Sequence, residues 1–394
     1  HTAGSTRRAR AYQAIGMLEE AIADCTHAIT LDPKCGRAFY LRGCIHAQNG
    51  DDALAEADMA QAKKLGYEPA GGSSIQREEE PWNNRETYLS MAEAITAIGK
   101  LGGTVRFEDR AKSPNWPSVS VEFGEHARIT DAVLGNLKRL PEDHILGLAK
   151  PKATDADFEA LRHWSRPIWL ALTDATVTSA GLDHLRALAD LRGLLLGLAC
   201  ATDADMESVK TLPTLIGLIL NDTAVTDVGV ERLKGLTELG YLYLAGTKVT
   251  DAGLAHLKEL RTLKELDLRR TKVTDEGMYC IKQMTQLQTL ALGDTQVTEA
   301  GLTGLYRLAN LEELDLSVPG VSDAGLAHLK GLLQLRGLAL RGTAITDRGL
   351  EHLQSLPKLE RLDLEDTNVS DEAVEQLQRN VAERESRKPL HVLR

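Results

Sequence analysis

Hydrophobic and polar residues alternate in a short cycle that recurs along most of the chain. Stretches such as "LKELDL" from Leu263 and "LERLDL" from Leu359 place polar residues between leucines, as in a strand with one buried face. Further along the same cycle, residues such as Gly253, Leu254 and Leu257 have the spacing of a short helix. Each cycle therefore predicts a strand, a turn and a helix.

The cycle returns every 24 residues with no insertion or deletion between its turns. A threonine or serine marks eleven copies: Thr130, Thr154, Thr178, Thr202, Thr226, Thr250, Thr274, Thr298, Ser322, Thr346 and Ser370. An acidic residue follows in ten of them, and Ser179 follows in the other. The hydroxyl is suited to cap the helix, and the carboxylate places negative charge beside the helix N-terminus.

One copy is too small to fold alone, because its few apolar side chains do not offset the entropy of ordering its backbone. Stacked copies bury each other's flanks and build a parallel sheet with strands about 4.8 Å apart. The period therefore predicts a solenoid in which each turn is the template for the next.

These copies resemble the leucine-rich repeat family, in particular its bacterial T-x-V-T-D-x-G-L type, over residues 119 to 387. The resemblance implies an α/β fold: a right-handed β-α solenoid of about eleven repeats with a parallel sheet on its concave face. The position that carries Asn or Cys in the family, where it links neighbouring turns, is usually threonine here, as at Thr247 and Thr271. It becomes Pro151, Ala175, Ala199 and Pro319 in other copies, where we expect weaker bonding between turns.

The first 69 residues predict two helix pairs, broken near Asp32-Pro33 and Asn49-Gly50. A 34-residue period relates small and aromatic residues of the two pairs: Tyr12, Ala21, Ala28 and Pro33, then Phe39, Gly43, Ala55, Met59 and Ala62. This pattern resembles the tetratricopeptide repeat, a family that binds extended peptides in its groove. A peptide-binding role and a purely structural role both remain open for this all-α module.

The composition divides the chain into four parts. We expect tetratricopeptide-like repeats over 1–69, a linker over 70–84, and a cap helix with the lead-in of the solenoid over 85–118. That helix should run from about Arg85 to Lys100. Leucine-rich repeats fill 119–394, and the long charged helix after Ser370 is typical of a polar terminal cap.

Charge, cysteine content and hydrophobicity indicate which partners and which cellular location to expect. The formal charge of -11 and pI near 5.6 argue against a nucleic-acid partner, because binding to phosphates needs clustered basic residues. Five cysteines without metal-ligand spacing indicate free thiols. No signal peptide or apolar run of membrane-spanning length is present, so we expect a cytoplasmic protein that does not enter a membrane.

The resemblance implies that residues flanking the strand leucines face a bound partner. Large apolar residues and aromatics occupy these positions in the earlier copies, and acidic residues in the later ones, although aromatic residues make up only 4% of the chain. Because exposed aromatics often anchor interfaces, we predict a partner-binding patch with an acidic rim that prefers a basic partner. The predicted residues are Trp169, Leu195, Ile219, Tyr241, Tyr243, Glu265, Asp267, Asp315 and Asp363.

Simpler explanations remain open for each candidate site. Strands favour aromatic residues without any partner. The recurring aspartate could bind cations, although helix capping accounts for it without an ion. His184, His256, His328 and His352 recur in the same helical position, but no cysteine or aspartate is patterned to complete a metal site with them.

No catalytic signature is present, so the sequence predicts a non-enzymatic scaffold without cofactors that binds a partner protein. The alternative is a regulatory or substrate-recruiting region of a larger signalling enzyme, such as a bacterial protein kinase. Its catalytic domain would precede residue 1, which is His rather than Met. Structural assembly by end-to-end stacking is a third possibility, and the sequence leaves the oligomeric state open.

Overall fold

The backbone of the computed structural model divides into two compact units, residues 1–171 and 172–394. The domain boundaries expected at 69, 84 and 118 stay predictions. The structure describes residues 5–6, 9–10, 12–13, 18–67, 85–107, 119–123, 129–140, 144–148, 159, 161, 168–173, 179–188, 190–197, 201–382 and 390–394.

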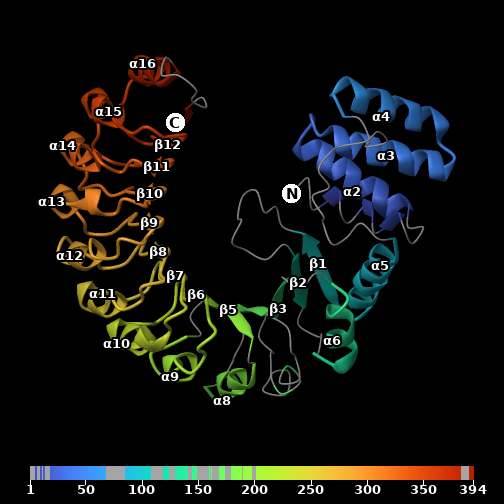
Figure 1. The fold of residues 1–394 in the computed structure, drawn as a ribbon, viewed down its shortest axis with the longest axis horizontal. Coiled ribbons are helices and arrows are strands. Elements are labelled where there is room, and N and C mark those ends of the chain that lie inside the picture. The colour runs from blue at the N-terminus through green and yellow to red at the C-terminus, as the bar shows by residue number, and fades with distance from the viewer. Residues whose placement is uncertain are drawn as a thin grey trace. The chain divides into compact units, whose positions relative to one another are not determined.

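The first unit opens with an antiparallel helical array (Figure 1). Its main helices are α2 (Leu18–Leu31), α3 (Gly36–Asn49) and α4 (Asp52–Lys64). Helices α3 and α4 approach each other closely, since a β-carbon at Gly43 would lie 3.0 Å from the carbonyl oxygen of Ala55. Arg42 joins the same two helices by two hydrogen bonds of 2.7 and 2.8 Å to Asp58. Cys25, Cys35, Cys44 and Cys280 are free thiols, and burial raises the pKa of Cys25 to about 12.

The rest of the first unit combines helices with a small sheet. Helix α5 (Arg85–Lys100) has the predicted bounds, and Ile95 and Ile98 are buried on its inner face. Strand β1 (Gly103–Phe107) pairs antiparallel with β2 (Val119–Phe123), a hairpin that the repeat pattern did not predict. Strands β3 (His144–Leu148) and β4 (Ile168–Thr173) continue in parallel, and α6 (Asp131–Leu137) follows β2.

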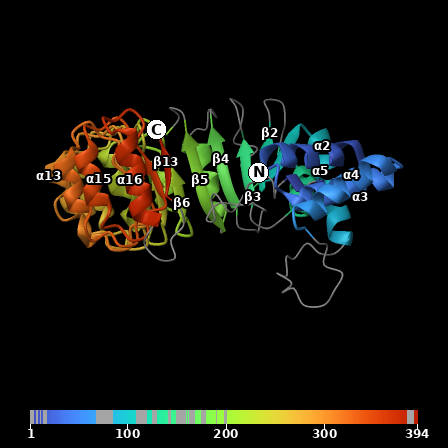
Figure 2. The same cartoon turned by 90° about the horizontal axis from the view of Figure 1, so that it is seen from above.

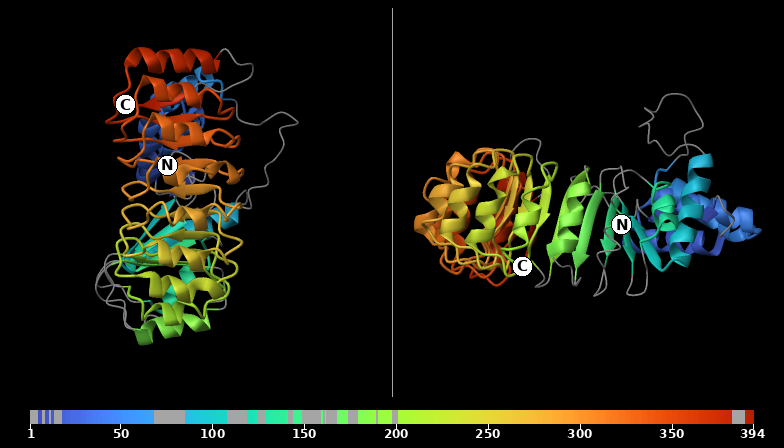
Figure 3. Two further views of the ribbon diagram at one scale, coloured as in Figure 1. Left: turned by 90° about the vertical axis from the view of Figure 1, so that its left-hand side faces the viewer. Right: turned by 90° about the horizontal axis from the view of Figure 1, so that it is seen from below.

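The second unit is the predicted solenoid. Figures 1 and 2 show its strands on one side of the coil and its helices on the other, and the left panel of Figure 3 shows the stacked turns. Its strands, each paired in parallel with the next, are β5 (Leu191–Gly197), β6 (Gly217–Ile219), β7 (Tyr241–Tyr243), β8 (Glu265–Asp267), β9 (Thr289–Ala291), β10 (Glu313–Asp315), β11 (Gly337–Ala339), β12 (Arg361–Asp363) and β13 (His391–Leu393).

Short helices cover the other side of this sheet, and the leucines between the two layers form its core. The α-helices are α8 (Ser179–His184), α9 (Met206–Val209), α10 (Asp227–Glu231), α11 (Asp251–Leu257), α12 (Met278–Ile281), α13 (Glu299–Leu302), α14 (Asp323–Leu326), α15 (Asp347–Leu353) and α16 (Asp371–Ala382). The 3-10 turns are η1 (Leu185–Ala187), η2 (Arg232–Gly235), η3 (Leu305–Arg307) and η4 (Ala327–Leu329).

The C-terminal end of the solenoid carries the predicted helix and an unpredicted strand. Helix α16 is described to Ala382, and the remainder of the expected helix lies outside the described residues. Strand β13 adds to β12, and Gln378 of α16 donates a 3.1 Å hydrogen bond to the carbonyl oxygen of Leu390. The last strand and the last helix are therefore tied to each other.

A hydrogen-bonded contact between successive repeats explains the T-D-x-G motif. Thr250 donates from its backbone N–H to Oδ1 of Asp227 and from its hydroxyl to Oδ2, both at 2.7 Å. Its hydroxyl also accepts from the N–H of Ala252, which confirms the predicted helix cap. We call this contact the Asp–Thr clamp. It recurs in the pairs Asp203–Thr226, Asp251–Thr274, Asp275–Thr298, Asp323–Thr346 and Asp347–Ser370.

The glycine of the motif makes room for the clamp. A β-carbon at Gly253 would lie 2.5 Å from Oδ1 of Asp227, the oxygen that accepts from Thr250. No larger residue fits while that carboxylate occupies the site. The aspartate was predicted to interact only with its own helix N-terminus, and its contact with the next repeat was not predicted.

Two junctions depart from this pattern. Where Ser179 replaces the aspartate, the following repeat has Asp205 in place of glycine, and this carboxylate accepts both the N–H and the hydroxyl of Thr202 at 2.8 Å. Where Glu299 replaces it, only the hydroxyl of Ser322 bonds to the carboxylate among the contacts of these two described residues. The longer side chain thus supports a weaker junction.

The expectation that threonine links neighbouring turns at the family's ladder position is wrong. The hydroxyls of Thr223, Thr247, Thr271, Thr295, Thr343 and Thr367 each donate to the carbonyl oxygen three residues earlier in the same repeat, at 2.6 to 2.7 Å. Neighbouring turns are instead joined by backbone bonds, such as that from Lys248 N–H to Val225, and by the clamps.

We predict that replacing Glu299 by aspartate strengthens its junction with Ser322, and that replacing Asp251 by glutamate weakens its junction with Thr274. Glu299→Asp should let the carboxylate accept from the Ser322 N–H as well, which raises stability by about 1 kcal/mol. Asp251→Glu should weaken the junction to Thr274 by a similar amount. Thermal melting and hydrogen exchange of the amides of residues 322 and 274 measure both effects. Slower exchange at 322 in Glu299→Asp is required, and unchanged exchange at both amides would contradict the clamp.

The clamp between Asp347 and Ser370 should make stability depend on pH. Hydrogen bonds from the N–H and hydroxyl of Ser370 lower the pKa of Asp347 from its usual 3.8. A carboxyl with a lowered native pKa contributes stability above its unfolded pKa and loses it as the pH falls through the native value. The difference in Tm between wild type and Asp347→Asn should therefore shrink below about pH 4. The control Glu351→Gln, on the exposed face of α15, should follow the wild-type profile, and a constant Asp347→Asn difference would refute this role.

Candidate functional site

Two rows of side chains project from the strand face of the second unit, on either side of the buried central leucines such as Leu242 and Leu266. The strand register aligns the residues before these leucines, which we call row A: Gly193, Gly217, Tyr241, Glu265, Thr289, Glu313, Gly337, Arg361 and His391. It also aligns the residues after them, row B: Leu195, Ile219, Tyr243, Asp267, Ala291, Asp315, Ala339, Asp363 and Leu393.

The first three strands bring predicted apolar residues together. Leu195, Ile219 and Tyr243 are direct neighbours in row B, and all three are partly exposed. Tyr241 lies beside them in row A, where burial, followed by the nearby charge of Glu265, raises the pKa of its hydroxyl.

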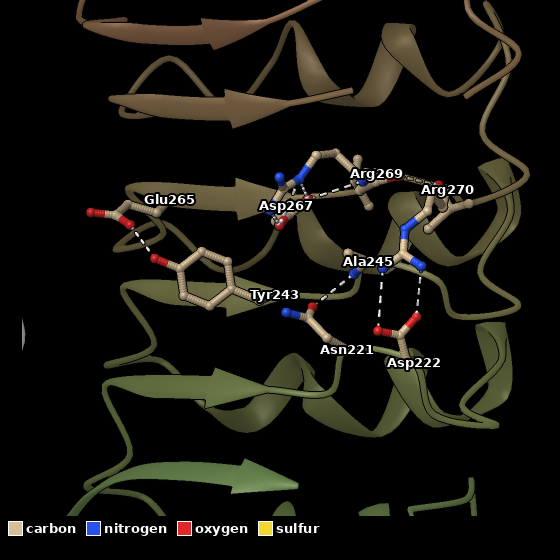
Figure 4. A network of polar contacts seen from close by, with 10 residues as sticks. Asn221, Asp222, Tyr243, Ala245, Glu265, Asp267, Arg269 and Arg270 are labelled. Atoms are coloured by element: carbon tan, nitrogen blue, oxygen red, sulfur yellow. Dashed lines mark hydrogen bonds and ion pairs between the residues drawn. The ribbon is translucent and has the colours of Figure 1, made fainter. Parts of the chain in front are cut away.

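A polar network follows directly on this apolar cluster (Figure 4). The hydroxyl of Tyr243 donates to Glu265 on the adjacent strand. Arg269 binds Asp267 through Nε at 3.0 Å from Oδ1 and through Nη2 at 2.6 Å from Oδ2. The hydrogen bonds from the guanidinium to Asp267 raise the pKa of Arg269. The backbone N–H of Arg269 also donates to Oδ1, so both carboxylate oxygens of Asp267 have a partner.

Two residues of the predicted patch, Asp267 and Trp169, are buried, although we expected them to be exposed. Asp267 is only 3% exposed because Arg269 covers it, so it does not form part of an open acidic rim. Trp169 lies in β4 of the first unit, opposite Ile145 of β3, and is 7% exposed. Strands in a sheet are about 4.8 Å apart, so flanking side chains can cover a planar ring of this size. Trp169 therefore lacks the exposure that we expected of an anchor.

The later strands form a groove of about 340 Å³ on the same face of the second unit. Rows A and B supply its walls and floor from β9 to β13, including the predicted Asp315 and Asp363. Its depth comes from Ala291, Gly337 and Ala339, whose side chains are small or absent. This groove was not predicted, because small side chains make it and the predicted patch consists of large and charged ones. The alternation of Ala291, Asp315, Ala339 and Asp363 every 24 residues was the available signal.

An ion pair crosses the groove between strands that are not adjacent. Glu313 of β10 pairs with Arg361 of β12, passing over Gly337 of β11. A β-carbon at Gly337 would lie 1.8 Å from Oε2 of Glu313, so only glycine admits this path. Burial raises the pKa of Glu313, and the charge of Arg361 acts in the opposite direction.

A similar arrangement lies at the turns after β6 to β8. Arg270 pairs with Asp222 through Nη1 at 3.0 Å from Oδ1, across Gly246 of the intervening repeat (Figure 4). A β-carbon at Gly246 would lie 2.2 Å from Oδ1 of Asp222. Arg270 has a φ of 56°, a left-handed conformation that costs a residue other than glycine about 1 kcal/mol or more. The ion pair helps to hold it there.

The remaining candidates show no site of their own. His184, His256, His328 and His352 are partly exposed on their helices. Among the described residues, no group of three or more His, Cys, Asp or Glu side chains is placed to hold a metal ion. None of the helices in the described parts of the chain has the length and apolar character needed to cross a membrane.

Comparison with known families accounts for both parts of the chain. The model for "Leucine Rich repeat" matches residues 259–282 and 355–377, and the model for "Tetratricopeptide repeat" matches residues 5–35. The chain contains leucine-rich repeats. Its helical front carries a tetratricopeptide repeat, in the first of the two predicted copies. Both repeat families typically serve as interaction modules rather than enzymes.

Solved structures similar to this chain include an internalin from Listeria monocytogenes, with 21% identity and a TM-score of 0.47, covering 64% of this chain and 76% of the internalin. A leucine-rich-repeat protein of Leptospira interrogans has 17% identity and a TM-score of 0.38, covering 64% of this chain and 72% of the other. No curated protein is significantly similar in sequence.

We predict that Gly337→Ala separates Glu313 from Arg361 without unfolding the repeat. The new methyl group would occupy the position of Oε2, and the flexible glutamate would turn toward solvent. Because burial raises the pKa of Glu313, this displacement should lower it toward the value of an exposed glutamate. Carbon-13 NMR titration of the glutamate carboxyls measures the shift, and Glu313→Gln assigns the signal. A pKa unchanged by Gly337→Ala would contradict the proposed path across the glycine.

Proposed function

We propose that this protein is a non-enzymatic scaffold that binds a partner protein on the strand face of its leucine-rich repeats. The observation that carries the proposal is the alignment of Leu195, Ile219 and Tyr243, partly exposed, on three adjacent strands. Adjacent apolar and aromatic side chains are favoured as interface anchors, because burying them removes apolar area from water at a small cost in side-chain entropy.

The polar residues beside this cluster support the proposal. The hydroxyl of Tyr243 is held by Glu265, so its ring is fixed before a partner arrives. Asp267 is neutralised by Arg269, which lets apolar residues of a partner approach without burying an unpaired charge. A fixed aromatic ring loses less freedom on binding than a mobile one.

Two other roles stay predictions. The same face could recruit substrates for a larger signalling enzyme, which the full-length reading frame would test. The groove of the tetratricopeptide repeats could hold a peptide. A cytoplasmic location is likewise a prediction.

We predict that Ile219→Ala/Tyr243→Ala reduces partner recovery by about tenfold or more, because central apolar anchors contribute most of the binding energy of an interface. The chain would be immobilised, exposed to lysate of the source cell, and the recovered proteins quantified by mass spectrometry. The matched control is Tyr279→Ala/Tyr306→Ala, whose tyrosines are 71% and 57% exposed in α12 and η3, on the helix side.

A photo-crosslinking residue at position 219 should also join the same partner covalently, whereas one at position 279 should not. The control pair should recover the partner as the wild type does. Equal recovery by the Ile219→Ala/Tyr243→Ala variant would exclude this face as the binding site.

A further inference from the structure

We propose that the groove over β9 to β13 binds a lysine or arginine side chain of the partner, held by Asp315 and Asp363. This inference rests on the proposed function, since it specifies the chemistry of a partner on the same face. The two aspartates lie on β10 and β12 and flank Ala339 of β11 in row B. At about 4.8 Å between strands, their α-carbons are about 10 Å apart.

The aspartates are oriented but not neutralised. Oδ1 of Asp315 accepts from the N–H of Ser317 at 2.9 Å, and Oδ1 of Asp363 accepts from the N–H of Glu365 at 3.0 Å. Each carboxylate therefore has a fixed direction and keeps Oδ2 for another donor. Within the described residues, no cation of the protein lies within ion-pairing distance of either one.

Asp267, the third aspartate of the same row, shows how such a carboxylate binds a guanidinium. It has the same backbone hydrogen bond to the residue two positions later, and that residue, Arg269, also binds both of its oxygens. The equivalent positions after Asp315 and Asp363 are Ser317 and Glu365, which bring no cation. Asp315 and Asp363 are therefore oriented like Asp267, but no arginine of their own repeat binds them.

The other cations near the groove are already paired. Arg361 binds Glu313, and Arg341 binds Glu365 and Asp366. Arg269, whose charge also acts on Asp315, forms its ion pair with Asp267. With Arg361 offsetting Glu313, the two aspartates leave the groove with a net charge of about -2 at neutral pH. The groove therefore attracts a cation and repels an acidic side chain.

The shape and surface of the groove select the kind of cation. Ala291 and Ala339 form hollows beside the aspartates, and Leu393 of β13 adds apolar surface at one end. Lysine and arginine combine a long aliphatic stem with a terminal charge, so the stem can lie on the apolar floor while the charge reaches the carboxylates. A bare metal ion would gain nothing from that floor.

The test uses five-residue peptides, Gly-Ser-Xaa-Ser-Gly with blocked ends, in which Xaa is lysine or arginine. Peptides with norleucine or citrulline keep the stem and lack the charge. Binding to the full chain is followed by NMR of carbon-13-labelled alanine methyls, with Ala339→Gly assigning the central signal. We expect the basic peptides to shift the Ala339 methyl in a saturable manner, and the neutral peptides to bind at least about fivefold more weakly.

The variant Asp315→Asn/Asp363→Asn should bind the basic peptides about tenfold more weakly than the wild type does. The control Glu351→Gln/Glu372→Gln removes the same charge from exposed positions of α15 and α16 and should leave binding unchanged. Ala339→Leu fills the hollow with both carboxylates intact, and should also abolish binding, which is followed in this variant through the methyl of Ala291. Its methyl spectrum and Tm would confirm that the repeat is folded.

Equal binding of lysine and norleucine peptides, or full binding by Asp315→Asn/Asp363→Asn, would overturn the proposal. So would the absence of any Ala339 shift with the basic peptides. In each of these cases, loss of the partner in Ile219→Ala/Tyr243→Ala would still uphold the scaffold function, so the two proposals fail separately.

Discussion

The solenoid depends on one recurring contact, the clamp in which an aspartate of one repeat receives the N–H and hydroxyl of the threonine in the next. The leucine core supplies a larger part of the stabilisation, but burial is not directional and does not fix the position of one turn on another. The clamp does, because two hydrogen bonds to one carboxylate require a defined separation and angle. The threonine hydroxyl also caps its own helix, so one group stabilises both the helix and the contact with the preceding repeat.

This contact leaves the strand face free for other uses. Backbone hydrogen bonds and clamps satisfy the polar groups of each turn, while the central leucine of each strand enters the core. The strand register is therefore set without the side chains of rows A and B. They vary from glycine to tyrosine and from aspartate to arginine without changing the strand register. A surface with that freedom can acquire specificity for a partner at little cost to the fold.

Much of the fold could be predicted from the sequence, since a 24-residue period shows directly which positions share an environment. Helix α5 has the bounds that its pattern predicted, and the threonine caps are confirmed. Asp267 and Trp169 could not be placed correctly, because their exposure depends on side chains that cover them. The repeat pattern shows on which row Asp267 lies, but not that the side chain of Arg269 covers it. Similarly, the repeat pattern shows that glycine follows the aspartate, but it does not show that the carboxylate of the preceding repeat fills that space.

Gly246 and Gly337 allow side chains of repeats that are not adjacent to contact each other. Each lies in the middle of three repeats and lets an ion pair join the two outer ones, Asp222 with Arg270 and Glu313 with Arg361. Contacts between adjacent repeats alone would let the coil bend independently at every junction. A pair that spans three repeats resists such bending at two junctions together. The Glu313 pair therefore holds the walls of the groove at a set separation, and the side chain that binds there meets a site already formed.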